Sequence, residues 1–192
     1  MATYLALLRG INLGSVNKVS MPELRTLFES LGHSDVRTYV QSGNVVFEAS
    51  SSASKKLARE IEEAIERTFG LAIPAVLRTR AQLQRVAVNN PFMSEGVKPT
   101  FLHVMFLAET PSSTAVRALD PDRSPPDKFA VKGREIYLCF PRGSGRSKLT
   151  IDYFEKKLGT RATGRNWNTV TKVLALMDDS RRTSKSKRRT DP

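Results

Sequence analysis

The order of apolar patterns in residues 1–79 constrains the fold more than any other feature of this sequence. A short apolar run over residues 3–9 predicts a buried strand, and apolar residues at helical spacing before Gly32 predict a helix. Two β-rich runs flanking residues 41–44 predict a hairpin. An amphipathic helix that ends at Gly70 and a strand over 73–78 follow. The resulting order of strand, helix, strand, strand, helix, strand is the split βαβ pattern of ferredoxin-like domains.

Several residues predict where the first helix begins and ends. Ser20 is placed as its N-cap, and Glu23 follows at the spacing of a capping box. Val19 and Leu24 are placed to pack against each other as a hydrophobic staple. Gly32 can adopt the left-handed conformation that commonly ends a helix.

Residues 80–179 nearly repeat this order. Their patterns predict a helix over 81–88, a strand over 101–107, a helix over 112–119, a hairpin over 129–140 and a helix over 149–158. From Trp167 onward the pattern is again helical, with Asn166 suited as N-cap. The second half is therefore expected to have a helix where the first half has its fourth strand.

These patterns predict an α+β protein of two similar ferredoxin-like (split βαβ) halves, 1–79 and 80–179. The helices of each half cover one face of its sheet, so the other face needs cover as well. The two halves can supply it by packing against each other or by joining their sheets, and we expect a single compact body.

The net charge of +12 is concentrated in part at the C-terminus. Residues 180–192 contain six basic residues, opposed by Asp191, and no large apolar residue. Such a segment cannot repay the entropy lost on ordering, so we expect a disordered basic tail. A solvated tail of this kind commonly has no specific partner, and contact with nucleic acid or with an anionic membrane is the alternative.

The composition argues against several classes of protein. The single cysteine, Cys139, lies in an apolar run typical of a core strand and cannot form an internal disulfide. No export signal is visible and the apolar stretches are far shorter than the ~20 residues of a membrane-spanning helix, so we expect a cytoplasmic protein without a membrane span. His33 and His103 lack neighbours at metal-ligand spacing, and no catalytic triplet is recognised. We therefore expect no metal and no cofactor, and we assign no catalytic residue.

The first candidate for binding is the loop over residues 9–18, between a strand and a helix N-terminus. Glycines allow backbone N–H groups to approach an anion, and Arg9 and Lys18 add positive charge. Asn12 and Asn17 lie in the same loop. The alternative is that the glycines serve turn geometry and the polar side chains bond to the loop itself.

The second candidate is the loop over residues 142–148, which joins another strand to a helix. It holds Arg142, Arg146 and Lys148, but not the Gly-Lys-Ser/Thr order of a phosphate loop. We expect the loops after the first and third strands of a half to share one edge of its sheet. We expect the hairpin tip, 41–44, to lie at the opposite end of the sheet from the Arg9 loop.

The third candidate is the segment over residues 165–169. Trp167 is expected to fill the core and Asn166 to cap the last helix, which leaves Arg165 and Asn168 free to meet a ligand. The polar hairpin tip, 41–44, has groups that can hydrogen-bond a base or a sugar, although such residues also suit turns.

Four segments that contain these residues resemble a bacterial family, domain of unknown function 1697. They are YLALLRGINLGSVNKVSMPELR, DVRTYVQSGNVVFEA, GRSKLTIDYFEKKLG and RNWNTVTKVLAL. The resemblance implies two related ferredoxin-like halves, and it implies no activity. The chain beyond Asp179 is not part of the recognised pattern.

The basic loops and the basic tail favour a non-catalytic binding module for a phosphate-bearing ligand, with nucleic acid ahead of a free nucleotide. The alternative is an enzyme acting on a small phosphorylated metabolite held by Arg9, Lys18, Arg146 or Arg165. No base or nucleophile is identified for such an enzyme. A third hypothesis is an assembly or scaffold protein that associates through unpaired sheet edges.

Overall fold

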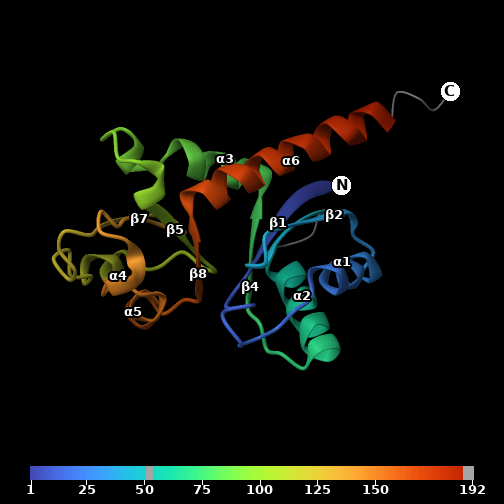
Figure 1. Cartoon of the computed structure of the whole chain (residues 1–192), viewed down its shortest axis with the longest axis horizontal. Coiled ribbons are helices and arrows are strands. Elements are labelled where there is room, and N and C mark those ends of the chain that lie inside the picture. The colour runs from blue at the N-terminus through green and yellow to red at the C-terminus, as the bar shows by residue number, and fades with distance from the viewer. Residues whose placement is uncertain (51–53, 188–192) are drawn as a thin grey trace. The chain divides into compact units, whose positions relative to one another are not determined.

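The chain forms two compact units, each with its own four-stranded antiparallel sheet. The computed structural model describes residues 1–50 and 54–187. Unit 1 comprises Met1–Gln84 together with the described chain from Lys172 onward, and unit 2 comprises Arg85–Thr171. The boundaries between the units fall within α3 (Arg80–Val88) and α6 (Trp167–Lys187), which are labelled in Figure 1.

Unit 1 has the order of elements that its sequence predicts. The elements are β1 (Ala2–Leu8), α1 (Met21–Ser30), β2 (Ser34–Tyr39), β3 (Asn44–Ala49), α2 (Ser54–Phe69) and β4 (Ala75–Thr79). The strand order in the sheet is β2-β3-β1-β4, and each neighbouring pair is antiparallel. Strands β1 and β2 therefore point the same way with β3 between them, as the split βαβ pattern requires.

The ends of α1 follow the prediction only in part. Gly32 has a φ of +81°, and its N–H donates to Glu29 O at 2.9 Å, so the helix stops where expected. Val19 and Leu24 are both buried. The capping box is not formed, since the Ser20 side chain makes no capping hydrogen bond.

The core of unit 1 lies between one face of its sheet and the two helices α1 and α2. Alternate residues of β1 (Tyr4, Ala6 and Leu8) enter this core, as period-two alternation along a strand requires. Phe47 packs edge-on against Phe28 with ring centroids 5.1 Å apart. The burial of these aromatic and aliphatic groups fixes the register of β1 and β3.

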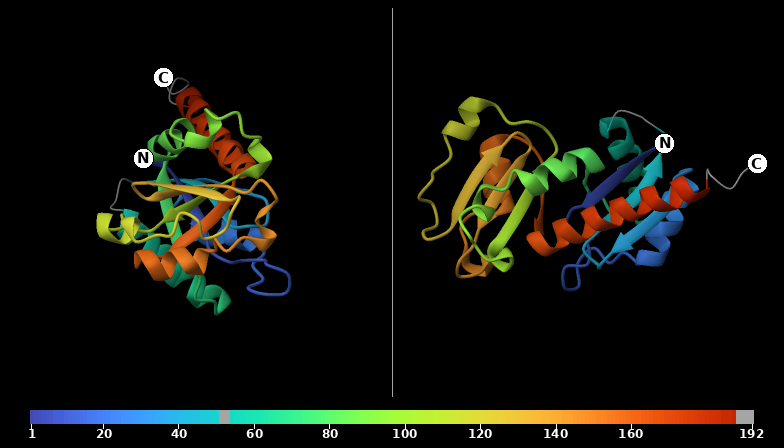
Figure 2. Two further views of the ribbon diagram at one scale, coloured as in Figure 1. Left: turned by 90° about the vertical axis from the view of Figure 1, so that its left-hand side faces the viewer. Right: turned by 90° about the horizontal axis from the view of Figure 1, so that it is seen from above.

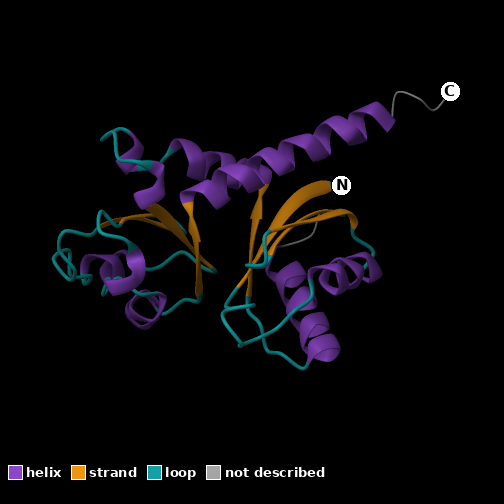
Figure 3. Cartoon of the chain, in the orientation of Figure 1, coloured by secondary structure: helices purple, strands orange, loops and turns teal. Residues whose placement is uncertain are grey.

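Unit 2 repeats the same architecture (Figure 3). Its elements are β5 (Leu102–Leu107), α4 (Ser113–Arg117), β6 (Lys128–Lys132), β7 (Glu135–Cys139), α5 (Ile151–Leu158) and β8 (Ala162–Asn166), with short 3-10 turns at η1 (Pro91–Met93), η2 (Pro99–Phe101) and η3 (Ser144–Arg146). The strand order, β6-β7-β5-β8, is equivalent to that of unit 1. The expected two similar halves are confirmed.

The prediction that the second half lacks a fourth strand is wrong. β8 pairs with β5 along its whole length, from Ala162 opposite Leu107 to Asn166 opposite His103. The strand sequence, Ala-Thr-Gly-Arg-Asn, has neither alternation nor aliphatic β-branched residues, so its pairing with β5 outweighs a weak local propensity. Asn166 is nevertheless the N-cap expected, because its side-chain oxygen accepts from Thr169 N at 2.8 Å.

Matching hydrogen bonds show how closely the two units correspond. Leu8 N donates to Gly43 O, and the equivalent Leu107 N donates to Arg134 O, both at 2.8 Å. The first residue of each fourth strand is also held in the same way. Ala75 N donates to Glu62 Oε1 at 2.8 Å, and Ala162 N donates to Glu155 Oε1 at 2.7 Å.

The strand directions correct two expectations about the loops. Because β1 and β3 are antiparallel, with Leu7 opposite Asn44, the end of β1 lies beside the hairpin tip. The tip and the Arg9 loop are therefore at the same end of the sheet, not at opposite ends. For the same reason the loops after the first and third strands of a unit lie at opposite ends of its sheet.

The C-terminal segment is helical as far as it is described. α6 continues through Lys187, so residues 180–187 of the predicted disordered tail have helical backbone, and residues 188–192 lie outside the described part of the chain. The reason is that extending an existing helix costs far less than starting one, and this stretch has no glycine or proline. Within unit 1, Arg80 of α3 forms an ion pair with Asp178 of α6.

Candidate functional site

Comparison of the two units shows where each carries extra chain. The connection between β1 and α1 spans residues 9–20, whereas its counterpart in unit 2 spans only 108–112. The connection between β7 and α5 spans 140–150, whereas its counterpart in unit 1 spans only 50–53. Both of these loops are longer than the shared fold requires, and both contain residues that the sequence marked as candidates. Loops of this kind commonly carry function.

The long loop of unit 1 is held by two asparagines in the left-handed conformation. Asn12 (φ +53°) donates from its amide to Val19 O at 2.9 Å and accepts from Val19 N at 2.9 Å. Asn17 (φ +48°) donates to Gly10 O at 3.0 Å. Asparagine tolerates this conformation because its short side chain can bond locally. These two predicted ligand-binding residues therefore use their side chains to hold the loop.

The same loop is joined to the hairpin tip. The Asn12 amide also donates to Gln41 O at 3.0 Å. A Cβ on Gly43 would lie 2.7 Å from Leu8 Cβ and 2.9 Å from Ile11 Cδ1, so only glycine allows this approach. We call residues 9–20 and 40–44 together the loop–tip corner of unit 1. It forms a single rigid feature at one end of the sheet.

The charged residues of the corner differ in accessibility. Lys18 is exposed and forms no ion pair with any residue that the structure describes. Arg9 is half-buried, and its backbone N–H donates to Pro74 O at 2.9 Å. The cation most open to a ligand at this corner is therefore Lys18.

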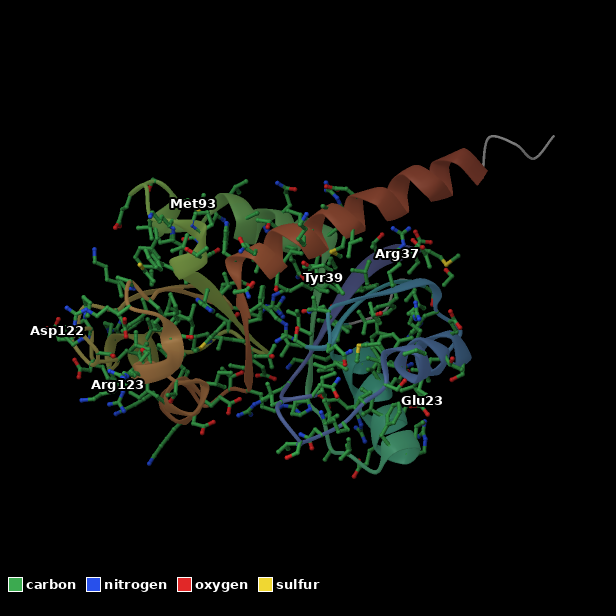
Figure 4. The ribbon with its side chains drawn as sticks, viewed as in Figure 1. Glu23, Arg37, Tyr39, Met93, Asp122 and Arg123 are labelled. Atoms are coloured by element: carbon green, nitrogen blue, oxygen red, sulfur yellow. The ribbon has the colours of Figure 1, made fainter. Side chains whose placement is uncertain are left out.

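The long loop of unit 2 is anchored near the start of α5. Lys148 N donates to Ser124 Oγ at 3.1 Å, and Arg123 Nε donates to Lys148 O at 3.0 Å. The Arg123 guanidinium also lies over the Tyr153 ring, 3.9 Å from its centroid, and Arg123 is labelled in Figure 4. Thr150 caps α5 by accepting from Tyr153 N at 3.2 Å. One end of the loop is thus fixed by side chains that the sequence did not single out.

Three cations of this loop are available to a ligand. Arg142, Arg146 and Lys148 are exposed, and none of them forms an ion pair within residues 1–50 and 54–187. We call residues 141–150 the basic loop. By contrast, cations on α2 pair with carboxylates one turn away, as in Arg59 with Glu63. The basic loop therefore has positive charge that the protein does not itself neutralise.

Both units carry a net positive charge. Residues 85–171 contain 14 basic and 8 acidic residues, and unit 1, which comprises residues 1–84 and 172–192, contains 17 and 11, so each unit has a net charge of +6. Net charge therefore does not distinguish the units, and what sets the basic loop apart is that three exposed cations lie together on it.

Arg165 does not belong with the basic loop, which corrects the expectation that it is free to meet a ligand. It lies in β8 with 8% of its surface exposed and donates to Thr163 Oγ1 at 2.8 Å and Gly164 O at 2.7 Å. Burial lowers the pKa of its guanidinium to about 10. Asn168, on the first turn of α6, is exposed, and Trp167 is buried as expected.

The described residues do not assemble a metal site or a membrane-spanning helix. No group of three or more His, Cys, Asp or Glu side chains within 1–50 and 54–187 is arranged to hold a metal ion. His33 and His103 are instead packed against the rings of Phe47 and Phe140. None of the helices in the described chain combines the length and apolar character needed to cross a bilayer.

Comparison with known proteins gives a family and a fold. Residues 1–137 match the family described as protein of unknown function (DUF1697). No curated protein matches the chain. Among solved structures, the conserved bacterial protein SP0830 from Streptococcus pneumoniae is similar, with a TM-score of 0.70 and 22% sequence identity over 92% of this chain and 98% of that one. At this level of identity the likeness shows the fold alone.

The family match includes the loop–tip corner and ends before the basic loop. Two of the segments on which the resemblance was recognised, GRSKLTIDYFEKKLG and RNWNTVTKVLAL, therefore lie beyond the matched residues. The matched range still covers well over half of the chain, with all six strands and helices of the first split βαβ pattern. The chain belongs to the DUF1697 family of proteins of unknown function.

Proposed function

We propose that this protein is a non-catalytic binding module for a phosphate-bearing ligand, with nucleic acid ahead of a free nucleotide. The observation that carries the proposal is the basic loop, whose Arg142, Arg146 and Lys148 are exposed and without ion pairs among the described residues. Unpaired cations repel one another and are commonly balanced in proteins by nearby carboxylates. Three of them on one loop fit a polyanion that releases counterions when it binds.

The anchoring of the loop supports the same proposal. Because Arg123 and Ser124 bond to the backbone of Lys148, that end of the loop loses little freedom when a ligand binds. A single small phosphate would need few of these charges. A phosphate backbone would contact several, which is why nucleic acid is preferred to a nucleotide.

The test is the salt dependence of binding. Affinities of the full chain for single- and double-stranded DNA and RNA would be measured by fluorescence anisotropy over a range of salt concentrations. If all three cations contact phosphates, R142Q/R146Q/K148Q should make the slope of log K against log salt shallower by up to ~2.7 for duplex DNA and up to ~2.1 for single strands. Binding that is absent, or that does not depend on salt, would remove the proposal.

A matched control separates local contact from net charge. K56Q/R59Q/R67Q removes the same charge from exposed positions on α2, in unit 1. This variant should leave the slope close to that of the unmodified protein. Equal losses in the two triple variants would show that binding responds to overall charge rather than to the basic loop. Stabilisation by a mononucleotide alone in a thermal-shift assay would favour the nucleotide.

A further inference from the structure

The loop–tip corner of unit 1 has an apolar surface that phosphate binding does not explain. Leu13, Val16 and Val40 are 63%, 58% and 52% exposed. Leu13 and Val16 form an isolated β-bridge, so the loop turns back on itself and holds both side chains near its end. Both views of Figure 2 show the segment after β1 standing out from the sheet of its unit. Leu13 and Val16 thus form a small exposed apolar surface at the end of this loop, and Val40 is exposed on the hairpin tip joined to it.

The backbone beneath this surface is strained and held in place. Val40 has a φ of +48°, which is a strong outlier for a β-branched residue. Its neighbours fix it on both sides, because the buried Asn44 donates to Tyr39 O at 2.9 Å and Asn12 donates to Gln41 O at 3.0 Å. Strain maintained by surrounding bonds is characteristic of binding sites.

The size of the surface limits what can cover it. Even a large aromatic side chain buries only ~150–250 Å². Three smaller side chains, exposed by no more than 63%, therefore fall well short of the ~800 Å² that each partner of a standard protein interface buries. These three side chains alone would therefore not hold a second copy of the chain. Their area fits a small ligand or one unit of a longer polymer.

The polar groups around the surface limit the ligand further. Gln41 is exposed, and its side-chain amide forms no hydrogen bond with a described residue. Lys18, on the same loop as Leu13 and Val16, carries an exposed positive charge. The corner thus combines a small apolar area, a side-chain amide that can donate and accept hydrogen bonds, and an exposed cation.

We propose that the loop–tip corner binds an unpaired base of a single-stranded nucleic acid. Leu13, Val16 and Val40 cover the face of the base, the Gln41 amide bonds to its edge, and Lys18 contacts the neighbouring phosphate. The base is unpaired because the faces of bases in a duplex are already stacked and only splayed-out bases offer them. The inference rests on the proposed function and specifies its ligand as single-stranded.

The experiment compares single strands with duplexes in the full chain. Affinities for fluorescein-labelled oligouridylate, oligothymidylate and a duplex of equal length are measured across salt. L13S/V16S changes exposed positions and should fold normally, which circular dichroism checks. We expect it to weaken single-strand binding by about tenfold or more at every salt concentration, because it removes apolar surface that the base would bury. The salt slope should not change, since apolar contacts release no counterions.

Two control variants make the result specific. V88S/M93S changes two other exposed apolar residues, in unit 2, and should leave single-strand affinity unchanged. K18Q should make the single-strand slope shallower by ~0.7, as expected for one phosphate contact. Single-strand affinity that is unaltered in L13S/V16S overturns the inference. A change of oligomeric state in that variant, seen by sedimentation velocity, also overturns it.

The two proposals fail in different ways. If L13S/V16S binds as the unmodified protein does while R142Q/R146Q/K148Q loses affinity, the base site is wrong and the phosphate-binding proposal stands. If L13S/V16S loses affinity and the triple variant does not, the corner binds nucleic acid and the basic loop does not. If the unmodified protein binds neither single strands nor duplexes at any salt concentration, both proposals are overturned.

Discussion

At the scale of single residues, Asn12 shows how one residue type can fit two interpretations. In a glycine-containing loop before a helix, an asparagine suits both ligand contact and turn formation. Its three side-chain hydrogen bonds, to Val19 N, Val19 O and Gln41 O, show the second role. The sequence could not separate the two roles, because the distant partner, Gln41, is brought close only by the pairing of β1 with β3.

Replacing Asn12 with alanine should therefore destabilise the fold. The variant loses three hydrogen bonds and places an alanine at φ +53°. We expect N12A to lower the free energy of unfolding by about 2 kcal/mol or more. Urea denaturation measures the change. N168A alters an exposed asparagine on α6 and should shift the same value by less than ~0.5 kcal/mol; similar losses in both variants would contradict the assigned role.

Gly43 is the residue at which a single methyl group should have the largest effect. A Cβ there would meet Leu8 Cβ at 2.7 Å, and the φ of +74° is itself unfavourable for alanine. We expect G43A to cost about 2 kcal/mol or more. G145A is the matched control, since nothing lies within 4 Å of its added Cβ and its φ is not positive. A normal melting temperature for G43A would show that the corner is not rigid.

The two histidines should make stability depend on pH. Burial lowers the pKa of both His33 and His103 below the ordinary value of 6.5. As the pH falls through that value, the unfolded chain takes up protons before the folded one, so the folded state loses stability. We expect the urea concentration at the unfolding midpoint to decrease as the pH is lowered from about 7.5 to about 5. The decrease should be smaller in H33Q/H103Q. A decrease of equal size in that variant would assign the effect to carboxylates.

At the scale of elements, local sequence predicted most of the fold. Apolar periodicity predicted α1, α2 and α5, and turn residues predicted both hairpins, because each pattern depends on neighbours in sequence. β8 was missed since its Ala-Thr-Gly-Arg-Asn sequence has no strand pattern and forms a strand only beside β5. The helical backbone of residues 180–187 was missed because composition does not show that α6 already supplies a helix to extend.

The fourth strands should depend on one glutamate in each unit. Glu62 on α2 accepts from Ala75 N, and Glu155 on α5 accepts from Ala162 N. Hydrogen bonds to a charged group contribute ~1.5–3 kcal/mol, so E62A and E155A should each lower stability by about that amount. E63A removes only a carboxylate from a surface ion pair and should cost ~0–1 kcal/mol. Hydrogen exchange should locate each loss in β4 or β8.

At the scale of the whole molecule, the candidate site depends on facts that no local pattern contains. Strand directions decide which loops lie at the same end of a sheet, and the antiparallel pairing of β1 with β3 places the hairpin tip beside the Arg9 loop. Comparison of the units also distinguishes loops that the fold requires from those it does not. The exposed Leu13 and Val16 could have been noticed in the sequence, since apolar residues in a polar loop are unusual.

The net charge of +12 should act on nucleic acid through more than one segment. Residues 181–187 contain four cations, Arg181, Arg182, Lys185 and Lys187, on the continuing backbone of α6. If each contacts a phosphate of a duplex, R181Q/R182Q/K185Q/K187Q should make the salt slope shallower by up to ~3.6.

The effect should add to that of R142Q/R146Q/K148Q when the two variants are combined, because contacts that share no phosphate are independent. A slope that stays at the unmodified value would show that these cations do not contact phosphates of the bound nucleic acid.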